Sequence, residues 1–182
     1  MNKSRIVVVE NCISPQFMDF VDRELQATTL QWQYQENVTG DTLANSNPGF
    51  ASSVFQNGAP VNMAYWFLYP LLLEAAGRHN LFVEQLLRIR VGAYVNRNTQ
   101  QHNNVHVDSS DPHIVGLYYP HDSDGDTVFF TAMDGKEELL RVSPKRGSMV
   151  FFDGNIPHAS SNPTERAIRL TVNYNFTGRW PE

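Results

Sequence analysis

The chain has 182 residues, of which 41% are hydrophobic and 18% are charged, and its formal net charge is -5. This length predicts one domain, and the low charged fraction excludes a long acidic or basic tail. The acidic balance argues against generic binding to nucleic acid or to anionic membranes. The single cysteine, Cys12, excludes an internal disulfide and a four-cysteine zinc site.

The sequence shows no pattern of a targeting signal or a membrane span. The apolar stretch Ile6–Val9 is too short for the core of a signal peptide. The longest apolar run, residues 63–73, is interrupted by Pro70 and is much shorter than the roughly 18–20 residues that cross a bilayer. We therefore expect a cytoplasmic protein without membrane contact, in which Cys12 is an inert buried thiol.

The N-terminal segment predicts a short strand followed by an amphipathic helix. Residues 6–10 are mainly β-branched, which is typical of a strand. Ser14 and Pro15 have the pattern of a helix start, with a capping hydroxyl followed by proline at the first helical position. Apolar residues at helical spacing then continue over residues 15–27, so one face of this helix is expected to pack on the core.

The next segment combines a long irregular stretch with a second helix. Residues 31–58 are rich in polar side chains with interspersed aromatic residues, and a stretch of this length is typical of a functional lid or an edge meander. We expect the lid to face the substrate. The second helix is expected over residues 60–77, with a kink or break at Pro70.

From residue 86 onward the sequence changes to a period of two. Apolar and polar residues alternate in short runs, and turn signals separate the runs. The expected strands cover residues 87–96, 113–119, 127–131, 139–142, 148–152 and 166–176. Helices followed by many short strands predict a mainly β jelly roll, of α+β type, with the helices packed on one sheet. Residues 1–85 form its N-terminal part and residues 86–176 its β core.

Three residues form a candidate metal site. His106 and Asp108 are separated by one residue, so on a strand both side chains would point to the same face. His158, just after the expected strand 148–152, can supply a second imidazole. Two imidazoles and one carboxylate are the ligand set of non-haem Fe(II) oxygenases, which leaves coordination positions open for a co-substrate and dioxygen.

The last expected strand carries a candidate carboxylate receptor. Its apolar face should pack against the helices, and its polar face contains Arg169 and Thr171 side by side. A guanidinium fork supplies two parallel charge-assisted hydrogen bonds to a carboxylate, and a neighbouring hydroxyl supplies a third donor.

With these motifs in order, the sequence resembles the Fe(II)- and 2-oxoglutarate-dependent oxygenases, particularly their prolyl-4-hydroxylase-like branch. The pattern H-x-D…H…R-x-S/T of that family is matched by His106, Asp108, His158, Arg169 and Thr171. Residues 147–152 and 168–173 resemble the seventh-to-eighth strand region of the family, and residues 117–119 resemble its Y-Y-L-N strand, with Pro120-His121 in place of Leu-Asn.

The resemblance implies a double-stranded β-helix, a cupin-like jelly roll, that holds Fe(II) through the two histidines and the aspartate. Arg169 and Thr171 would bind the far carboxylate of 2-oxoglutarate, and Tyr94 and Tyr119 match positions whose phenols contact this co-substrate. The implied reaction uses dioxygen to hydroxylate a C–H bond and releases succinate and carbon dioxide, with possible stimulation by ascorbate.

Several alternatives remain open at this point. A non-catalytic cupin-like module that binds a metal or a small ligand would share the fold. Halogenation is disfavoured because the halogenases of the family lack the carboxylate that Asp108 provides. The substrate, whether a peptidyl proline, a free amino acid, a metabolite or a nucleobase, is not determined by the fold. The oligomeric state is also open.

The remaining histidines and charged groups suggest weaker sites. His102 and His106 would share a zinc ion only on a helix, and the segment does not favour one. Residues 122–126 resemble the start of a calcium loop but lack its glycine and its terminal glutamate, so a hairpin turn is expected. His113 and His121 could line the pocket, and the roles of His102, His113 and His121 stay open. Solvated side chains are expected for Arg97 and Arg146.

Overall fold

The structure is a computed structural model and describes residues 5–27, 30–38, 47–99 and 101–181. These residues form the helices α1 (Pro15–Gln26) and α2 (Tyr65–Arg78). Their strands are β1 (Ile6–Val9), β2 (Gln33–Gln35), β3 (Gly49–Gln56), β4 (Ala59–Pro60), β5 (Phe82–Val95), β6 (Ile114–Tyr119), β7 (Thr127–Phe130), β8 (Glu138–Val142), β9 (Ser148–Asp153), β10 (His158–Ser160) and β11 (Ile168–Arg179).

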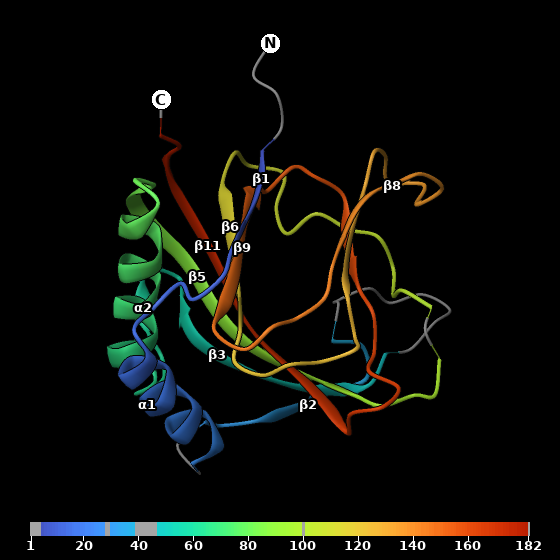
Figure 1. Cartoon of the computed structure of the whole chain (residues 1–182), viewed down its shortest axis with the longest axis horizontal. Helices are drawn as coiled ribbons and strands as arrows, with labels where there is room; N and C mark the ends of the chain where they lie inside the picture. The colour runs from blue at the N-terminus through green and yellow to red at the C-terminus, as the bar shows by residue number, and fades with distance from the viewer. Residues whose placement is uncertain (1–4, 28–29, 39–46, 100, 182) are drawn as a thin grey trace.

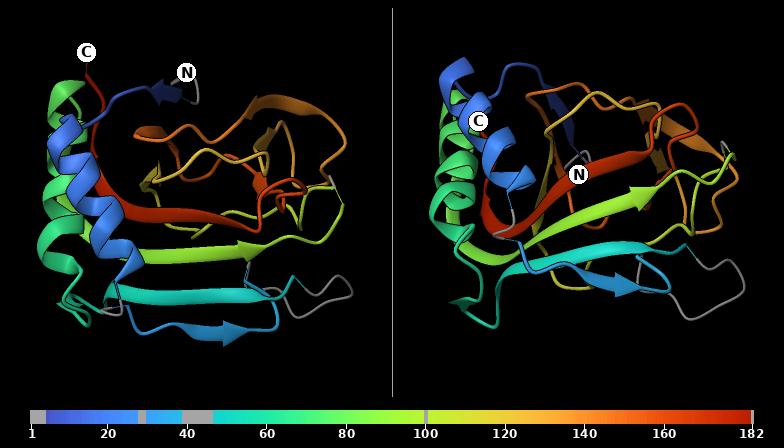
Figure 2. Two further views of the ribbon diagram at one scale, coloured as in Figure 1. Left: turned by 60° about the horizontal axis from the view of Figure 1, so that its bottom comes forward. Right: turned by 90° about the horizontal axis from the view of Figure 1, so that it is seen from below.

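The strands form two sheets with the helices on one side. The large sheet has the order β1-β9-β6-β11-β5-β3-β2, and β4 pairs with β3; the small sheet has the order β10-β7-β8. Both helices cover the outer face of the large sheet, and the small sheet lies on its other side (Figure 1). Figure 2 shows β11, β5, β3 and β2 following one another to the sheet edge. The predicted jelly roll with helices on one sheet is therefore confirmed.

Helix α1 begins as the sequence predicts. The hydroxyl of Ser14 accepts a hydrogen bond from the backbone N–H of Phe17 at 3.3 Å, and Pro15 occupies the first turn. Its apolar side packs on the sheet through Met18, Val21 and Leu25, all buried. Neither α1 nor α2, nor any other helix in the described ranges, is long and apolar enough to cross a membrane.

Three hydrophobic clusters lie among the described residues, and the two larger ones hold the layers together. The larger lies between the helices and the large sheet, and it includes the apolar face of β11 with Val172, Tyr174 and Phe176. The hydroxyl of Tyr174 also donates to the carbonyl of Leu68 in α2 at 2.9 Å. The smaller core fills the space between the two sheets. The expectation that the apolar face of the last strand packs against the helices is thus confirmed.

The N-terminal half agrees with the expected edge meander and differs from the expectation in where the second helix begins. Within the expected irregular stretch 31–58, β2 and β3 add two strands to the edge of the large sheet, whereas residues 39–46 of that stretch lie outside the described residues. The second helix begins at Tyr65 because β4 first pairs with β3, and the side chain of Asn62 then accepts the Ala64 N–H at 2.9 Å.

The segment that resembled a calcium loop braces the start of β11. Both carboxylate oxygens of Asp124 accept hydrogen bonds from the following loop: the N–H and hydroxyl of Thr164 at 2.7 Å each, the N–H of Glu165 at 2.9 Å and that of Arg166 at 3.3 Å. Burial raises the pKa of Asp124, but these hydrogen bonds outweigh it and hold the pKa below its ordinary value.

We predict that Asp124→Ala lowers the free energy of unfolding by about 2 kcal/mol at pH 7, because it removes several charge-assisted hydrogen bonds. A depressed folded-state pKa contributes stability that is present above the unfolded value of about 4 and is lost as pH falls through the folded value. The difference between wild type and variant, measured by urea unfolding, should therefore shrink below about pH 4. Asp134→Ala, which removes one turn hydrogen bond and one exposed ion pair with Lys136, is the control; equal losses in both variants would contradict the prediction.

Candidate metal and carboxylate-binding site

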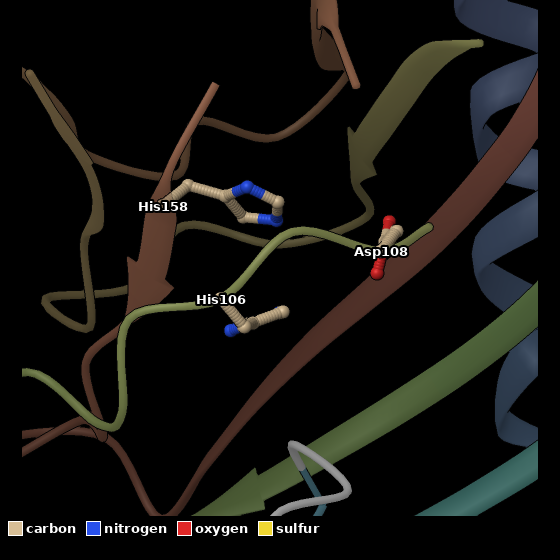
Figure 3. A group of neighbouring side chains, drawn as sticks. All are labelled: His106, Asp108 and His158. Carbon is tan, nitrogen blue, oxygen red and sulfur yellow. The ribbon is translucent and has the colours of Figure 1, made fainter. Parts of the chain in front are cut away.

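The structure brings His106, Asp108 and His158 together. One ligand atom from each lies within 4.8 Å of the others, close enough for small side-chain rotations to bring them onto one ion. His106 and His158 exchange backbone hydrogen bonds of 2.9 and 3.0 Å, so an isolated antiparallel bridge places the two rings side by side (Figure 3). The expectation that His106 and Asp108 lie on a continuous strand is wrong: only His106 pairs, and the next residues are irregular.

Hydrogen bonds fix both imidazoles in the form that a metal requires. Nδ1 of His106 lies 3.1 Å from the carbonyl of Asn104, and Nδ1 of His158 lies 3.0 Å from the carbonyl of Ile156. Since a carbonyl only accepts, each Nδ1 carries the proton and each Nε2 keeps a lone pair for an ion. Burial, followed by the charge of His106, lowers the pKa of His158 to about 4, so this ring is neutral at pH 7.

Asp108 is held by three side chains of the large sheet. Oδ2 accepts hydrogen bonds from the amides of Asn173 and Asn175, both at 3.0 Å, and Oδ1 lies 3.0 Å from Nη2 of Arg88. Burial raises the pKa of Asp108, but the Arg88 charge, His158 and the two amides outweigh it and hold the pKa well below its usual range. The carboxylate is therefore ionised and oriented before any ion arrives.

A second polar centre lies further along β11. Arg169 is only 1% exposed, and its Nη2 donates to the hydroxyl of Thr127 at 2.7 Å. Its Cζ lies 5.0 Å from the ring centroid of Tyr94 and 5.9 Å from that of Tyr119. Within the described part of the chain, its Nε has no hydrogen-bond partner and no carboxylate pairs with it. A buried charge without a counterion is costly, so this guanidinium can bind a carboxylate.

A cavity of about 260 Å³ extends from two of the candidate metal ligands to the neighbours of Arg169, and neither His158 nor Arg169 lines it. His106 and Asp108 line one part of it, and Tyr94 and Thr171, which neighbour Arg169, line another. Tyr119 is fully buried and its hydroxyl donates to Thr127 at 2.7 Å, so this tyrosine supports Thr127 next to Arg169. The remaining residues of the cavity wall are Val38, Arg88, Arg90, Gly92, Val107, Leu117 and Asn173.

Sequence reasoning missed four polar residues of this site. Asn173 and Asn175 lie on the polar face of the expected last strand, where their spacing from Arg169 and Thr171 could have indicated a shared role. Arg88 lies on another alternating strand, but its pairing with Asp108 depends on the tertiary structure. Nothing in the sequence indicated a role for Thr127, because it is the first residue of an otherwise apolar strand.

The other expected groups lie elsewhere. His102 packs on Phe130 at a ring distance of 4.8 Å and is not part of the metal cluster found among the described residues. His113 donates from Nδ1 to the carbonyl of Asp111, and His121 lines a separate apolar cavity. Arg146 is not simply solvated, because it forms ion pairs with Asp19 and Asp22.

The single cysteine is buried, as expected. Cys12 is fully enclosed in the larger core, and this burial raises the pKa of its thiol to about 12. At physiological pH the thiolate, which is the reactive form, is therefore almost absent.

No protein-family model matches the sequence, and no curated protein sequence matches it significantly. Solved structures match it in fold. An oxidoreductase of the 2OG-Fe(II) oxygenase family from Burkholderia pseudomallei has a TM-score of 0.70 at 14% identity, covering 94% of this chain and 84% of that one. A prolyl-4-hydroxylase from Pseudomonas putida has a TM-score of 0.60 at 18% identity, covering 96% and 94%. HygX from Streptomyces hygroscopicus, solved with nickel, 2-oxoglutarate and hygromycin B bound, has a TM-score of 0.61 at 12% identity, covering 96% and 83%.

The fold is that of the 2-oxoglutarate oxygenases. This likeness to a 2-oxoglutarate oxygenase fold, with a prolyl-4-hydroxylase among the matching structures, confirms the fold that the sequence resemblance implied.

We predict that Asn175→Ala weakens metal binding by about tenfold, because the amide orients Asp108 and also receives the Arg88 Nε–H at 3.0 Å. The measurement is a Ni(II) titration against a chromophoric chelator. Gln85→Ala, which truncates an exposed side chain on the same strand as Arg88, is the matched control. Equal affinities in wild type and both variants would show that Asp108 needs no support.

Proposed function

We propose that the protein is a non-haem Fe(II)- and 2-oxoglutarate-dependent dioxygenase that hydroxylates a C–H bond and releases succinate and carbon dioxide. One observation carries the proposal: a single cavity joins a two-histidine, one-carboxylate cluster to the surroundings of a buried guanidinium that has no acidic partner among the described residues. These are the two ends of a site for a metal chelated by a dicarboxylate.

The residues present fit Fe(II). His106 and His158 offer neutral Nε2 atoms, and Asp108 offers an ionised carboxylate, which is the ligand set that leaves several coordination positions open. When bound, Fe(II) with 2-oxoglutarate and dioxygen supplies the oxidising chemistry, and the protein supplies binding and orientation. The hydrogen bonds to Nδ1 of both histidines keep their rings from turning away, and the amides of Asn173 and Asn175 do the same for the carboxylate.

The residues around Arg169 fit the far carboxylate of 2-oxoglutarate. The unpartnered Nε–H of the guanidinium can donate to it, and the neighbouring hydroxyl of Thr171 can add a further hydrogen bond. The hydroxyl of Thr127 accepts a hydrogen bond from the guanidinium, and Tyr119 donates to the same hydroxyl. Tyr94 packs against the guanidinium and lines the cavity. We assign Tyr94 and Tyr119 to this positioning of the co-substrate end.

The substrate enters from the cavity, and a small molecule or part of a peptide can reach the metal ligands. Among matching structures, one prolyl hydroxylase holds a hypoxia-inducible factor peptide and HygX holds hygromycin B, so the fold accommodates both classes. Strand β3 from residues 1–85 pairs with residues 89–94 of β5, which supports one domain. We place the enzyme in the cytoplasm, because its single buried cysteine suits a reducing compartment.

We predict that the protein with Fe(II), 2-oxoglutarate and ascorbate forms succinate, and that anaerobic addition of Fe(II) and 2-oxoglutarate gives a visible absorption band. His106→Ala and Asp108→Ala should abolish both signals, because each removes a ligand. A cupin-like binding module, the alternative, would retain its ligand binding after the Asp108 substitution. Absence of both signals in the wild-type protein would contradict the proposal that the protein is an enzyme.

We predict opposite effects of Arg169→Met on stability and on co-substrate binding. The substitution removes a buried charge without a counterion and keeps a side chain that fills space, so the metal-free protein should become more stable by about 1 kcal/mol. The dissociation constant of 2-oxoglutarate should rise at least about a hundredfold, because the charge-assisted hydrogen bonds to its far carboxylate are lost. Metal binding should remain. Urea unfolding and 2-oxoglutarate titration measure the two effects; a strong loss of stability would instead assign Arg169 to the architecture.

A further inference from the structure

The inner face of β5 carries two arginines in different electrostatic situations. Arg88 and Arg90 both line the cavity, two residues apart on the same face of the strand. Arg88 is balanced, since it forms an ion pair with Asp108 and donates to Asn173 and Asn175. Arg90 is half-buried, and within the described part of the chain its guanidinium has neither an ion pair nor a side-chain hydrogen bond.

The register of the sheet places Arg90 beside the metal ligands. On β11 its cross-strand partner is Asn173, the residue whose amide holds Asp108 at 3.0 Å. On its other side the partner is Ser53 of β3. The far-carboxylate end of the site lies four register positions away on the same face, where Tyr94 pairs with Arg169. Arg90 therefore belongs to the part of the cavity in which a substrate would approach the metal.

The formal charges leave Arg90 available to a ligand other than the metal and the co-substrate. With Fe(II) and 2-oxoglutarate bound, Asp108, Arg88 and Arg169 already leave the site with a net positive charge, so the co-substrate does not need Arg90 for neutralisation. Asp108 is the only acidic residue among those that line the cavity in the described ranges. A partly desolvated guanidinium in such a place favours an anionic ligand.

We propose that Arg90 binds a carboxylate of the substrate, and that the enzyme acts on a small carboxylic acid. The proposal rests on the proposed function, which provides the metal and the co-substrate in the same cavity. A volume of about 260 Å³ that must also hold 2-oxoglutarate leaves room for a small molecule. One unpaired planar fork matches one carboxylate, whereas phosphate sites usually gather several N–H donors or backbone amides.

The test uses propionate as a carboxylate probe, propionamide as its neutral isostere and inorganic phosphate as the alternative anion. Each is titrated into protein loaded with Zn(II), a redox-inactive and diamagnetic ion, and 2-oxoglutarate, and binding is followed by NMR through the backbone amide signals of β5, which every variant retains. The same titration is repeated with Arg90→Gln and with Arg23→Gln, an exposed arginine on α1. The dissociation constant of 2-oxoglutarate is measured for each protein.

Saturable binding of propionate at least about tenfold tighter than that of propionamide, lost in Arg90→Gln and kept in Arg23→Gln, is the expected result. Equal binding of the acid and the amide, or no binding of either, overturns the proposal. Tighter binding of phosphate overturns the assignment to a carboxylic acid. If Arg90→Gln raises the 2-oxoglutarate dissociation constant as strongly as that of propionate, Arg90 serves the co-substrate and the proposal is wrong.

Failure of the proposed function gives a different result. In that case the wild-type protein does not bind Zn(II) and 2-oxoglutarate together, and this is measured before any probe is added. The propionate titration of the metal-free protein then still reports whether Arg90 accepts a carboxylate, with Arg169→Met added to remove the other guanidinium that could bind the probe.

Discussion

The antiparallel pairing of β5 with β11 is the constraint on which both the fold and the site depend. Each strand alternates between an apolar face, which packs on the helices, and a polar face, which points to the cavity. A slip of one residue would turn the apolar residues into the cavity and the arginines into the core, so burial of the apolar face fixes the register. The polar pairs set by this register are Arg169 with Tyr94, Thr171 with Gly92, Asn173 with Arg90 and Asn175 with Arg88.

The two buried charges of the site are treated in opposite ways. Asp108 receives three donors from the large sheet, so the protein itself compensates the burial of its charge. Arg169 is more completely enclosed, but its compensation from the described residues is a hydroxyl and two aromatic faces. The first arrangement stabilises a ligand in the geometry that a metal needs. The second leaves a deficit that an incoming carboxylate can fill, and the folded protein is less stable than it could be until one arrives.

The sequence predicted the parts of the molecule whose structure is local. Period-two alternation located the strands from β5 onward except β10, and the Ser14–Pro15 start located α1. It was least specific where pairing decides the structure: within the polar stretch 31–58 it allowed a lid or an edge meander, and β3 becomes a strand by pairing with β5 and β2 by pairing with β3. His106 and Asp108 were expected together for the wrong reason, since a backbone bridge to His158 and amides from β11, rather than a strand of their own, orient them. Such supports join residues far apart in sequence, and no local pattern reveals them.

Three arginines face the inner side of the same strand pair, and residue type alone would assign them one role. Their partners separate them. Arg88 is committed to Asp108 and the two asparagines, Arg169 to a hydroxyl and two rings beneath the cavity, and Arg90 to no charged group in the described chain. A guanidinium whose charge is neutralised by the protein can hold neighbouring residues in position. A guanidinium without a counterion can instead select a ligand by its charge. Because the register spaces these groups along the sheet, the order of their proposed roles in metal support, anion selection and co-substrate binding follows from the same hydrophobic alternation that folds the chain.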